Sequence, residues 1–255
     1  MAEENRLKGN PLAVIDITTT PITQQRKQQI AREINYSETV FLHHGSPGHN
    51  PRVEIFTPVN EMEFAGHPVV GTGHVLFQSL LGSSAVGGQG LTLETKAGPM
   101  ALQYDRDAKV VSAAVPSNVH VHSRECPSAS LQSIQSSLVG ASGLQSTYPT
   151  VSIVKGVTYV LVNFTDSPEL FANLAPGPNP TVDLDEGWGP SFVGTMYYRV
   201  LQSRVEGSVH VWDLRVRMIA INLEDPACGS GSSALGAFLA LQENGNRKHR
   251  FNIDQ

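Results

Sequence analysis

Two Gly-rich stretches place polar residues directly before apolar segments that are expected to be helical. The first, "EFAGHPVVGTG", carries Gly66 and His67, and the second, "EDPACGSGSSALG", carries Asp225 and one of only two cysteines. A Gly-rich turn that opens a helix presents unpaired backbone N–H groups and the positive end of the helix macrodipole. Such a helix start suits a carboxylate, or an enolate that forms in a transition state. The candidate substrate-binding residues at these turns are Gly66, Cys228, Gly229 and Ser230.

Neither stretch matches the phosphate-binding loop pattern G-x-x-x-x-G-K-[ST]. The short sequences "GTG" and "GSG" are too common to indicate a nucleotide by themselves. We therefore expect a small carboxylate-bearing metabolite as the ligand, and tight strand-to-helix joints without a ligand are the alternative.

Proton transfer on such a metabolite also needs a base. In "INYSETVFL", Glu38 lies where a predicted helix gives way to a predicted strand, next to Ser37. Apolar neighbours there would desolvate the carboxylate and raise its pKa toward neutrality, which suits a group that takes and returns a proton. The residues alone leave open whether Glu38 is this base or an ordinary surface glutamate.

The elements that position these residues follow from apolar periodicity and capping signals. A helix follows Thr23, which suits its N-cap. A second helix is predicted over 68–81 and closed by Gly82, and a third over 232–244 and ended by Gly245. Both later helices are apolar on most sides, which indicates burial at the centre of a domain. Strand patterns fill most of the remaining chain.

An internal repeat relates the two Gly-rich stretches. When Cys228 is superimposed on Ala65, an offset of 228 − 65 = 163, identities fall on the strand entry, the turn glycine, a helix-packing glycine and the helix-ending glycine. We predict an α+β protein with two pseudo-symmetric domains, 1–115 and 116–255, each a barrel-like, mostly antiparallel sheet around a central helix. The active site is expected between them.

Composition excludes several classes of function. The 255-residue chain has a formal net charge of -5 and no Lys/Arg cluster, which argues against nucleic-acid binding. The polar N-terminus and the absence of a run of about 18 apolar residues predict a soluble, cytoplasmic protein that makes no membrane contact. Cys126 and Cys228 lie far apart in sequence, so no structural disulfide is expected. No metal site is expected either, and "VHVH" at 119–122 is interpreted as an exposed strand face.

Four ordered blocks resemble the PhzF-like isomerase family of phenazine biosynthesis, within the diaminopimelate-epimerase fold superfamily. The blocks are "GNPLAV", "AREINYSETVFL", "RVEIFTPVNEMEFAGHPVVGTGHVL" and "VRMIAINLEDPACGSGSSALGAFL". The resemblance implies two similar domains, a tendency to form homodimers, and a reaction like the isomerisation of trans-2,3-dihydro-3-hydroxyanthranilate, in which a glutamate moves a proton without metal or organic cofactor.

The resemblance also implies roles for individual residues. The catalytic glutamate of the S-E-T motif falls on Glu38, and the polar partners of substrate and proton fall on His67 and Asp225. The family's carboxylate or oxyanion donors fall on Gly66, Gly229 and Ser230, and Ser37 is a weaker neighbour.

Three departures leave alternatives open. The chain differs from the family pattern before "GNP" and after "RFNIDQ", so both barrels are expected to lack edge strands. Cys228 stands where the family motif commonly has Thr, and it is similar to the second cysteine of cysteine racemases. A cysteine at a helix N-terminus is expected to have a lowered pKa, so an epimerase that uses Glu38 and Cys228 is one alternative. A non-catalytic protein that binds a metabolite or another protein is the other.

Overall fold

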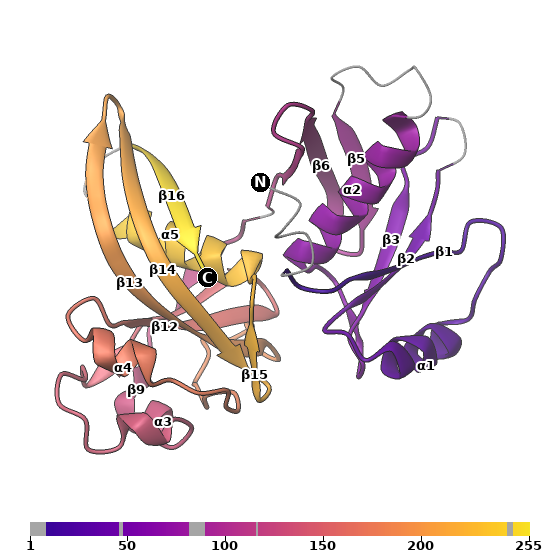
Figure 1. Cartoon of the computed structure of the whole chain (residues 1–255). Coiled ribbons are helices and arrows are strands. Elements are labelled where there is room, and N and C mark those ends of the chain that lie inside the picture. Colours follow the sequence, from indigo (N-terminus) through magenta and orange to yellow (C-terminus); the bar gives the residue numbers. More distant parts are fainter. Residues whose placement is uncertain (1–8, 46–47, 82–89, 116, 244–246) are drawn as a thin grey trace. The chain divides into compact units, whose positions relative to one another are not determined.

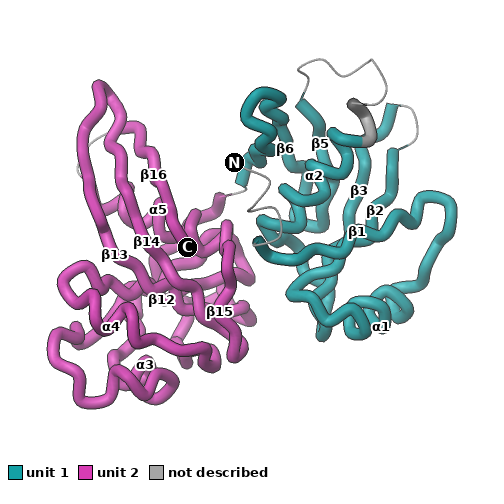
Figure 2. The backbone as a smooth tube through the Cα atoms, in the orientation of Figure 1, with its two compact units in different colours: residues 1–116 teal, residues 117–255 magenta. Residues whose placement is uncertain are grey.

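The structure is a computed structural model, and it describes residues 9–45, 48–81, 90–115, 117–243 and 247–255. The chain forms two compact units, Met1–Pro116 and Ser117–Gln255 (Figure 2). Each unit contains a mixed sheet and one long apolar helix (Figure 1). The units are described separately below.

Unit 1 is built on a sheet with the strand order β1-β2-β3-β5-β6-β7, with β4 paired to β3. The pairs β1–β2 and β3–β5 are parallel and the others are antiparallel. The strands are β1 (Ala13–Asp16), β2 (Thr39–His43), β3 (Arg52–Phe56), β4 (Glu61–Met62), β5 (Leu91–Thr95), β6 (Gly98–Asp105) and β7 (Val110–Ala113), and the helices are α1 (Gln24–Ile34) and α2 (Gly66–Leu81).

The two helices of unit 1 cover opposite faces of its sheet. On β2, Val40 and Leu42 pack in the core cluster that contains α2 residues, whereas Phe41 packs in a separate cluster with Ala31 of α1. Successive strand side chains point to opposite faces, so a strand covered on both sides must be apolar throughout. This explains why β2 lacks polar alternation.

The first helix begins where its sequence signal predicts. The Thr23 side chain accepts a hydrogen bond from the Arg26 backbone N–H, which confirms the N-cap. Asn35 ends α1 in the left-handed conformation, with φ 54°, and its N–H donates to the Ala31 carbonyl. Glu38 follows this turn and immediately precedes β2.

Unit 2 has a sheet with the order β15-β14-β13-β12-β11-β8, with β16 paired to β14. The short elements Ser128–Gln132, Ser136–Leu138 and Pro168–Ala172 lie on the face of this sheet opposite α5 (Gly229–Gln242), around a cluster that includes Phe171, Tyr197 and Ile219. The strands are β8 (His120–Val121), β9 (Cys126–Pro127), β10 (Thr147–Tyr148), β11 (Thr150–Val154), β12 (Val157–Asn163), β13 (Phe192–Glu206), β14 (Val209–Ala220), β15 (Leu223–Asp225) and β16 (Lys248–Asp254), and the helices are α3 (Ser128–Gln132), the 3-10 helix Ser136–Leu138, α4 (Pro168–Ala172) and α5 (Gly229–Gln242).

Strand register confirms the internal repeat. In unit 1, Ile55 faces Met62 and Phe56 faces Glu61, and in unit 2, Met218 faces Asp225 and Ile219 faces Glu224. Each residue of the second set lies 163 positions after its counterpart, as in 219 − 56 = 163. The parallel, antiparallel, parallel order of β1-β2-β3-β5 also recurs in β12-β13-β14-β16.

Both long helices begin earlier than their apolar patterns predict. α2 begins at Gly66 instead of residue 68, and α5 begins at Gly229 instead of residue 232. The reason is that the turn glycines already adopt the helical conformation, although they carry no apolar side chain that would register in a periodicity. The predicted closing residues Gly82 and Gly245 lie outside the described residues.

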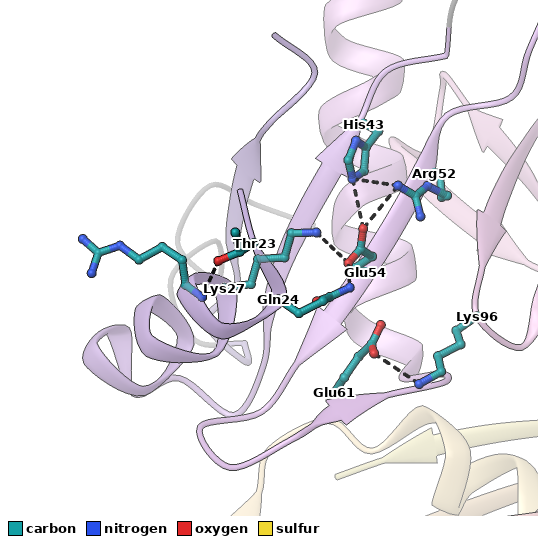
Figure 3. A network of polar contacts seen from close by, with 9 residues as sticks. Thr23, Gln24, Lys27, His43, Arg52, Glu54, Glu61 and Lys96 are labelled. Atoms are coloured by element: carbon teal, nitrogen blue, oxygen red, sulfur yellow. Dashed lines mark hydrogen bonds and ion pairs between the residues drawn. The ribbon is translucent and has the colours of Figure 1, made fainter. Parts of the chain in front are cut away.

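A buried carboxylate fastens α1 to the sheet of unit 1 (Figure 3). Oε2 of Glu54 on β3 accepts hydrogen bonds from Lys27 Nζ and Gln24 Nε2, both at 2.7 Å. Its other oxygen lies 3.1 Å from His43 Nε2 and 3.3 Å from Arg52. Burial would raise the pKa of Glu54, but the hydrogen bonds from Lys27, Gln24 and His43 outweigh it and hold that pKa below its ordinary value.

Within the described part of the chain, none of the helices has the length and apolar character that crossing a membrane requires.

Candidate functional site

The structure brings together two of the three predicted catalytic residues. Oε2 of Glu38 lies 3.4 Å from Nε2 of His67, at the junction of the start of β2 with the first turn of α2. The side chains of Glu38 and His67 are 16% and 18% exposed, so each is shielded yet reachable by a small molecule. A carboxylate in contact with an imidazole can take a proton from a bound molecule and return it.

Three buried hydroxyls, two beside Glu38 in sequence and one on α2, lack a hydrogen-bond partner among the described residues. They are Oγ of Ser37 and Oγ1 of Thr39, the two neighbours of Glu38, and Oγ1 of Thr72 on α2. Buried polar atoms are nearly always satisfied, so a group of unsatisfied ones needs a reason. Thr39 and Thr72 are fully buried, and Ser37 alone of these three residues is partly exposed.

The first turn of α2 has few backbone N–H groups that could donate a hydrogen bond to a ligand. Gly66 is the first helical residue, and Pro68 in the first turn has no N–H. Proline is favoured at this end of a helix because the first N–H groups have no intrahelical acceptor. The N–H groups of Gly66 and His67 therefore remain as the donors of this turn that can face an anion.

The remaining predicted residues lie in unit 2, at the start of α5. Ser230 Oγ is 2.6 Å from the hydroxyl of Tyr159 on β12, and Cys228 Sγ is 3.3 Å from the same hydroxyl. Gly229 opens the helix, and Asp225 ends β15. The sequence therefore placed Cys228, Gly229 and Ser230 correctly at a helix start, but it gave no sign of Tyr159.

The predicted low pKa of Cys228 is wrong. Burial, reinforced by the nearby charge of Asp225, raises the pKa of the thiol to about 11. The side chain is 6% exposed and belongs to the core cluster between α5 and the sheet of unit 2. A helix N-terminus lowers a thiol pKa only where the thiolate gains more from the dipole than it loses in solvation. The structure thus favours Cys228 as a small packing residue.

This assignment predicts slow alkylation of Cys228. With a pKa of about 11, the thiolate fraction at pH 7 is about 10⁻⁴, roughly a hundredfold or more below that of a free cysteine. In a Cys126→Ser variant, iodoacetamide should therefore label the folded chain at pH 7 at least about 100-fold more slowly than the same chain in denaturant, as followed by mass spectrometry. Equal rates would contradict the burial of the thiol and reopen the epimerase alternative.

Asp225 shapes the turn that leads into α5. Its Oδ1 accepts a hydrogen bond of 2.9 Å from the backbone N–H of Ala227. The side chain of Gln255 spans the same turn, because its Oε1 accepts from the Cys228 backbone N–H at 2.8 Å and its Nε2 donates to the Asp225 carbonyl. Gln255 is thus a second residue that the sequence did not indicate, since it lies 27 positions from Cys228.

The repeat shows that the carboxylate of Glu38 has no counterpart in unit 2. Thr39 pairs with Phe56 as Thr195 pairs with Ile219, so Gly194 occupies in unit 2 the position of Glu38 in unit 1. Conversely, Ala65 occupies in unit 1 the position of Cys228. The two halves therefore carry different residue types at both positions.

Two groups of side chains have the donor types of a metal site, contrary to the prediction that none would. One consists of His120, His122 and Asp185, and the other of His210, Glu243 and His249. The interpretation of "VHVH" as an exposed strand face is also wrong, because His122 is buried and its ring lies against Asp185. The sequence did not indicate the first group, because Asp185 lies more than 60 positions from both histidines.

The comparisons with known proteins agree with this fold. Residues 3–255 match the profile of the PhzC-PhzF family, described as phenazine biosynthesis-like protein. Trans-2,3-dihydro-3-hydroxyanthranilate isomerase of Pseudomonas aeruginosa is 30% identical over 213 residues, which cover 79% of this chain and 72% of that enzyme.

Two solved structures share the fold. A PhzF-family phenazine biosynthesis protein of Bacillus anthracis aligns with a TM-score of 0.64 and 21% identity, covering 93% of this chain and 77% of that one. A predicted epimerase of Pseudomonas aeruginosa aligns with a TM-score of 0.62 and 24% identity, covering 91% and 76%. The predicted two-domain α+β fold class is confirmed. Because the family profile spans nearly the whole chain and the relatives are named as isomerases and epimerases, the chain belongs to the PhzC-PhzF family of phenazine biosynthesis-like proteins and is an enzyme of the isomerase class.

Proposed function

We propose that the protein moves a proton between two carbons of a small, conjugated, carboxylate-bearing metabolite, with Glu38 as the acid and base. The contact of 3.4 Å between Glu38 and His67 carries this proposal. The isomerase from Pseudomonas aeruginosa supports the reaction class, since its named substrate is a molecule of this type.

The proposed reaction balances without a further reactant. The Glu38 carboxylate removes a proton from one carbon, the electron pair moves through the conjugated system, and the protonated Glu38 returns the proton to another carbon. His67 positions the carboxylate and the substrate. The N–H groups of Gly66 and His67 at the start of α2 are proposed to hold the substrate carboxylate, and the predicted roles of Gly229 and Ser230 in unit 2 stay predictions. Both proton transfers are assigned to one side chain, so the proposal includes no organic cofactor.

The asymmetry of the two halves favours isomerisation over epimerisation. A two-base epimerase needs an acid on one face of the carbon and a base on the other. The position in unit 2 that corresponds to Glu38 is occupied by Gly194, which has no side chain that could serve as acid or base. Cys228, the remaining candidate, is only 6% exposed and lies in the core cluster of unit 2, which shields its thiol from a substrate. A single base that shuttles a proton is consistent with both observations.

Deuterium incorporation tests this proposal. The protein is incubated in D2O with trans-2,3-dihydro-3-hydroxyanthranilate as the first probe, then with other small unsaturated acids and with amino acids. Isomerised product that carries solvent deuterium is the expected result. Inversion at a single carbon without isomerisation would contradict it, and binding without turnover of any probe would favour a non-catalytic role.

His67→Gln is expected to lower kcat/KM by about 10- to 100-fold, because the contact with Glu38 and the proposed contact with substrate are both weakened. His74→Gln is the matched control, since His74 lies on the same helix but stacks edge-on against Tyr104. Steady-state kinetics on an active probe measures both variants. Equal effects of the two substitutions would remove His67 from the site.

A further inference from the structure

His120, His122 and Asp185 form a compact group in unit 2 that the proposed reaction does not use. The two histidines lie two positions apart at β8, so their side chains share one face of the strand. Asp185 comes from the segment that precedes β13. Its Oδ2 lies 2.7 Å from His120 Nε2 and 3.8 Å from His122 Nδ1.

These spacings are close to those of a metal-binding triad. Ligands at about 2.0 to 2.2 Å from a tetrahedral zinc ion stand roughly 3.3 Å apart. The three candidate ligand atoms all lie within 4.8 Å of one another. Movements of about 1 Å would therefore suffice to place an ion among them.

The hydrogen bonds around His122 determine its protonation. The backbone N–H of Asp185 donates to His122 Nδ1 at 3.1 Å, so Nδ1 carries a lone pair. The proton of the neutral ring is then on Nε2, which donates to Ser152 Oγ at 2.9 Å inside the core. A metal-ligating histidine is commonly oriented in this way through its second nitrogen. An ion at Nδ1 would replace the hydrogen bond from the Asp185 N–H.

The other two side chains are also held in place. The His120 ring stacks on Trp188 at 4.4 Å with an interplanar angle of 9°. Oδ1 of Asp185 accepts a hydrogen bond of 2.6 Å from Ser123 Oγ, and Oδ2, which faces the histidines, also accepts one of 3.1 Å from the Ser123 backbone N–H. The side chains of His120 and Asp185 remain 31% and 25% exposed, so an ion can enter and retain water.

We propose that His120, His122 and Asp185 bind one divalent transition-metal ion, of which Zn²⁺ is the probe of choice. Two imidazoles and one carboxylate match the ligand preferences of zinc, whereas Mg²⁺ prefers oxygen ligands alone. The ion would tie the segment before β13 to β8 in unit 2.

The group of His210, Glu243 and His249 supplies an internal control of similar composition. Here His210 Nδ1 is 2.8 Å from Glu243 Oε2, and His249 Nδ1 accepts a 3.3 Å hydrogen bond from the Trp212 indole N–H. No buried hydroxyl orients a ring in this group among the hydrogen bonds of the described residues. We therefore assign the ion to the first group.

Titration of the full chain with Zn²⁺ tests the assignment, after chelator treatment and removal of the chelator. Isothermal calorimetry and the thermal midpoint are measured for the wild type and for His120→Gln, Asp185→Asn, Ser152→Ala and His249→Gln. We expect one ion per wild-type chain and a higher midpoint with Zn²⁺ but not with Mg²⁺. Ser152→Ala should weaken binding by about 10- to 100-fold, and the two ligand variants by more. His249→Gln should bind like the wild type.

Three results would overturn the assignment. They are no Zn²⁺ binding by the wild type, unchanged affinity in His120→Gln and Asp185→Asn, or loss of binding in His249→Gln alone. His120 is partly exposed, so His120→Gln decides the question if circular dichroism shows that Asp185→Asn does not fold.

Discussion

Glu38→Gln is expected to lower kcat/KM for proton transfer by about 10²- to 10⁴-fold while the chain stays folded. Gln keeps the size of the side chain but cannot accept a proton from carbon, and acid-base catalysis by one positioned group typically contributes a factor of this size. The same variant should lose incorporation of solvent deuterium. Turnover of an active probe and mass spectrometry of the product measure the two effects.

Glu33→Gln is the matched control for this experiment. Glu33 is an exposed glutamate on α1, five positions before Glu38, and it should leave both rate and deuterium uptake unchanged. Circular dichroism and the thermal midpoint establish that Glu38→Gln is folded. Deuterium uptake equal to that of the wild type would remove Glu38 from the role of base, and the result would leave the proposed zinc site untouched.

Lys27→Met is expected to lower the free energy of unfolding by about 3 to 5 kcal/mol. The Lys27 ammonium and the Glu54 carboxylate are only 5% and 8% exposed, and Lys27 donates the 2.7 Å hydrogen bond of Figure 3. Removing one partner of a buried ion pair leaves the other charge uncompensated, which costs more than the pair itself contributes. Denaturant unfolding of both proteins gives the difference.

Lys96→Met is the control from the same figure. Lys96 pairs with Glu61 at 3.1 Å, but its side chain is 50% exposed, so a loss within about 1 kcal/mol is expected. The double variant Lys27→Met/Glu54→Gln should regain part of the stability, because it removes the buried charge as well. A loss below about 1 kcal/mol for Lys27→Met would mean that Arg52 and His43 alone satisfy Glu54.

The same pair predicts how stability changes with pH. The pKa of Glu54 is lower in the folded than in the unfolded chain, so the pair stabilises the protein above the ordinary glutamate pKa. This stabilisation is lost as the pH falls toward the lowered pKa. The difference in unfolding free energy between wild type and Lys27→Met should accordingly shrink in acid.

The sequence determined the repeat, the N-cap of α1 and the presence of two Gly-rich turns before the long helices, because all of these depend on local or regularly spaced residues, although both long helices begin two or three residues before the predicted starts. Gly66 and Gly229 open their helices, Thr23 caps α1, and the offset of 163 recurs in the strand pairing. Apolar runs also indicated buried central helices, since a helix without a polar face must be covered on most sides.

Only the tertiary structure decided which distant side chains meet and what protonation state results. Tyr159 reaches Ser230 across 71 positions, and Asp185 reaches His120 across 65. No periodicity carries such pairings, because they depend on strand order and loop path. The pKa of Cys228 was likewise set by the core that surrounds the thiol and not by its place in a motif, since desolvation outweighs the favourable helix start.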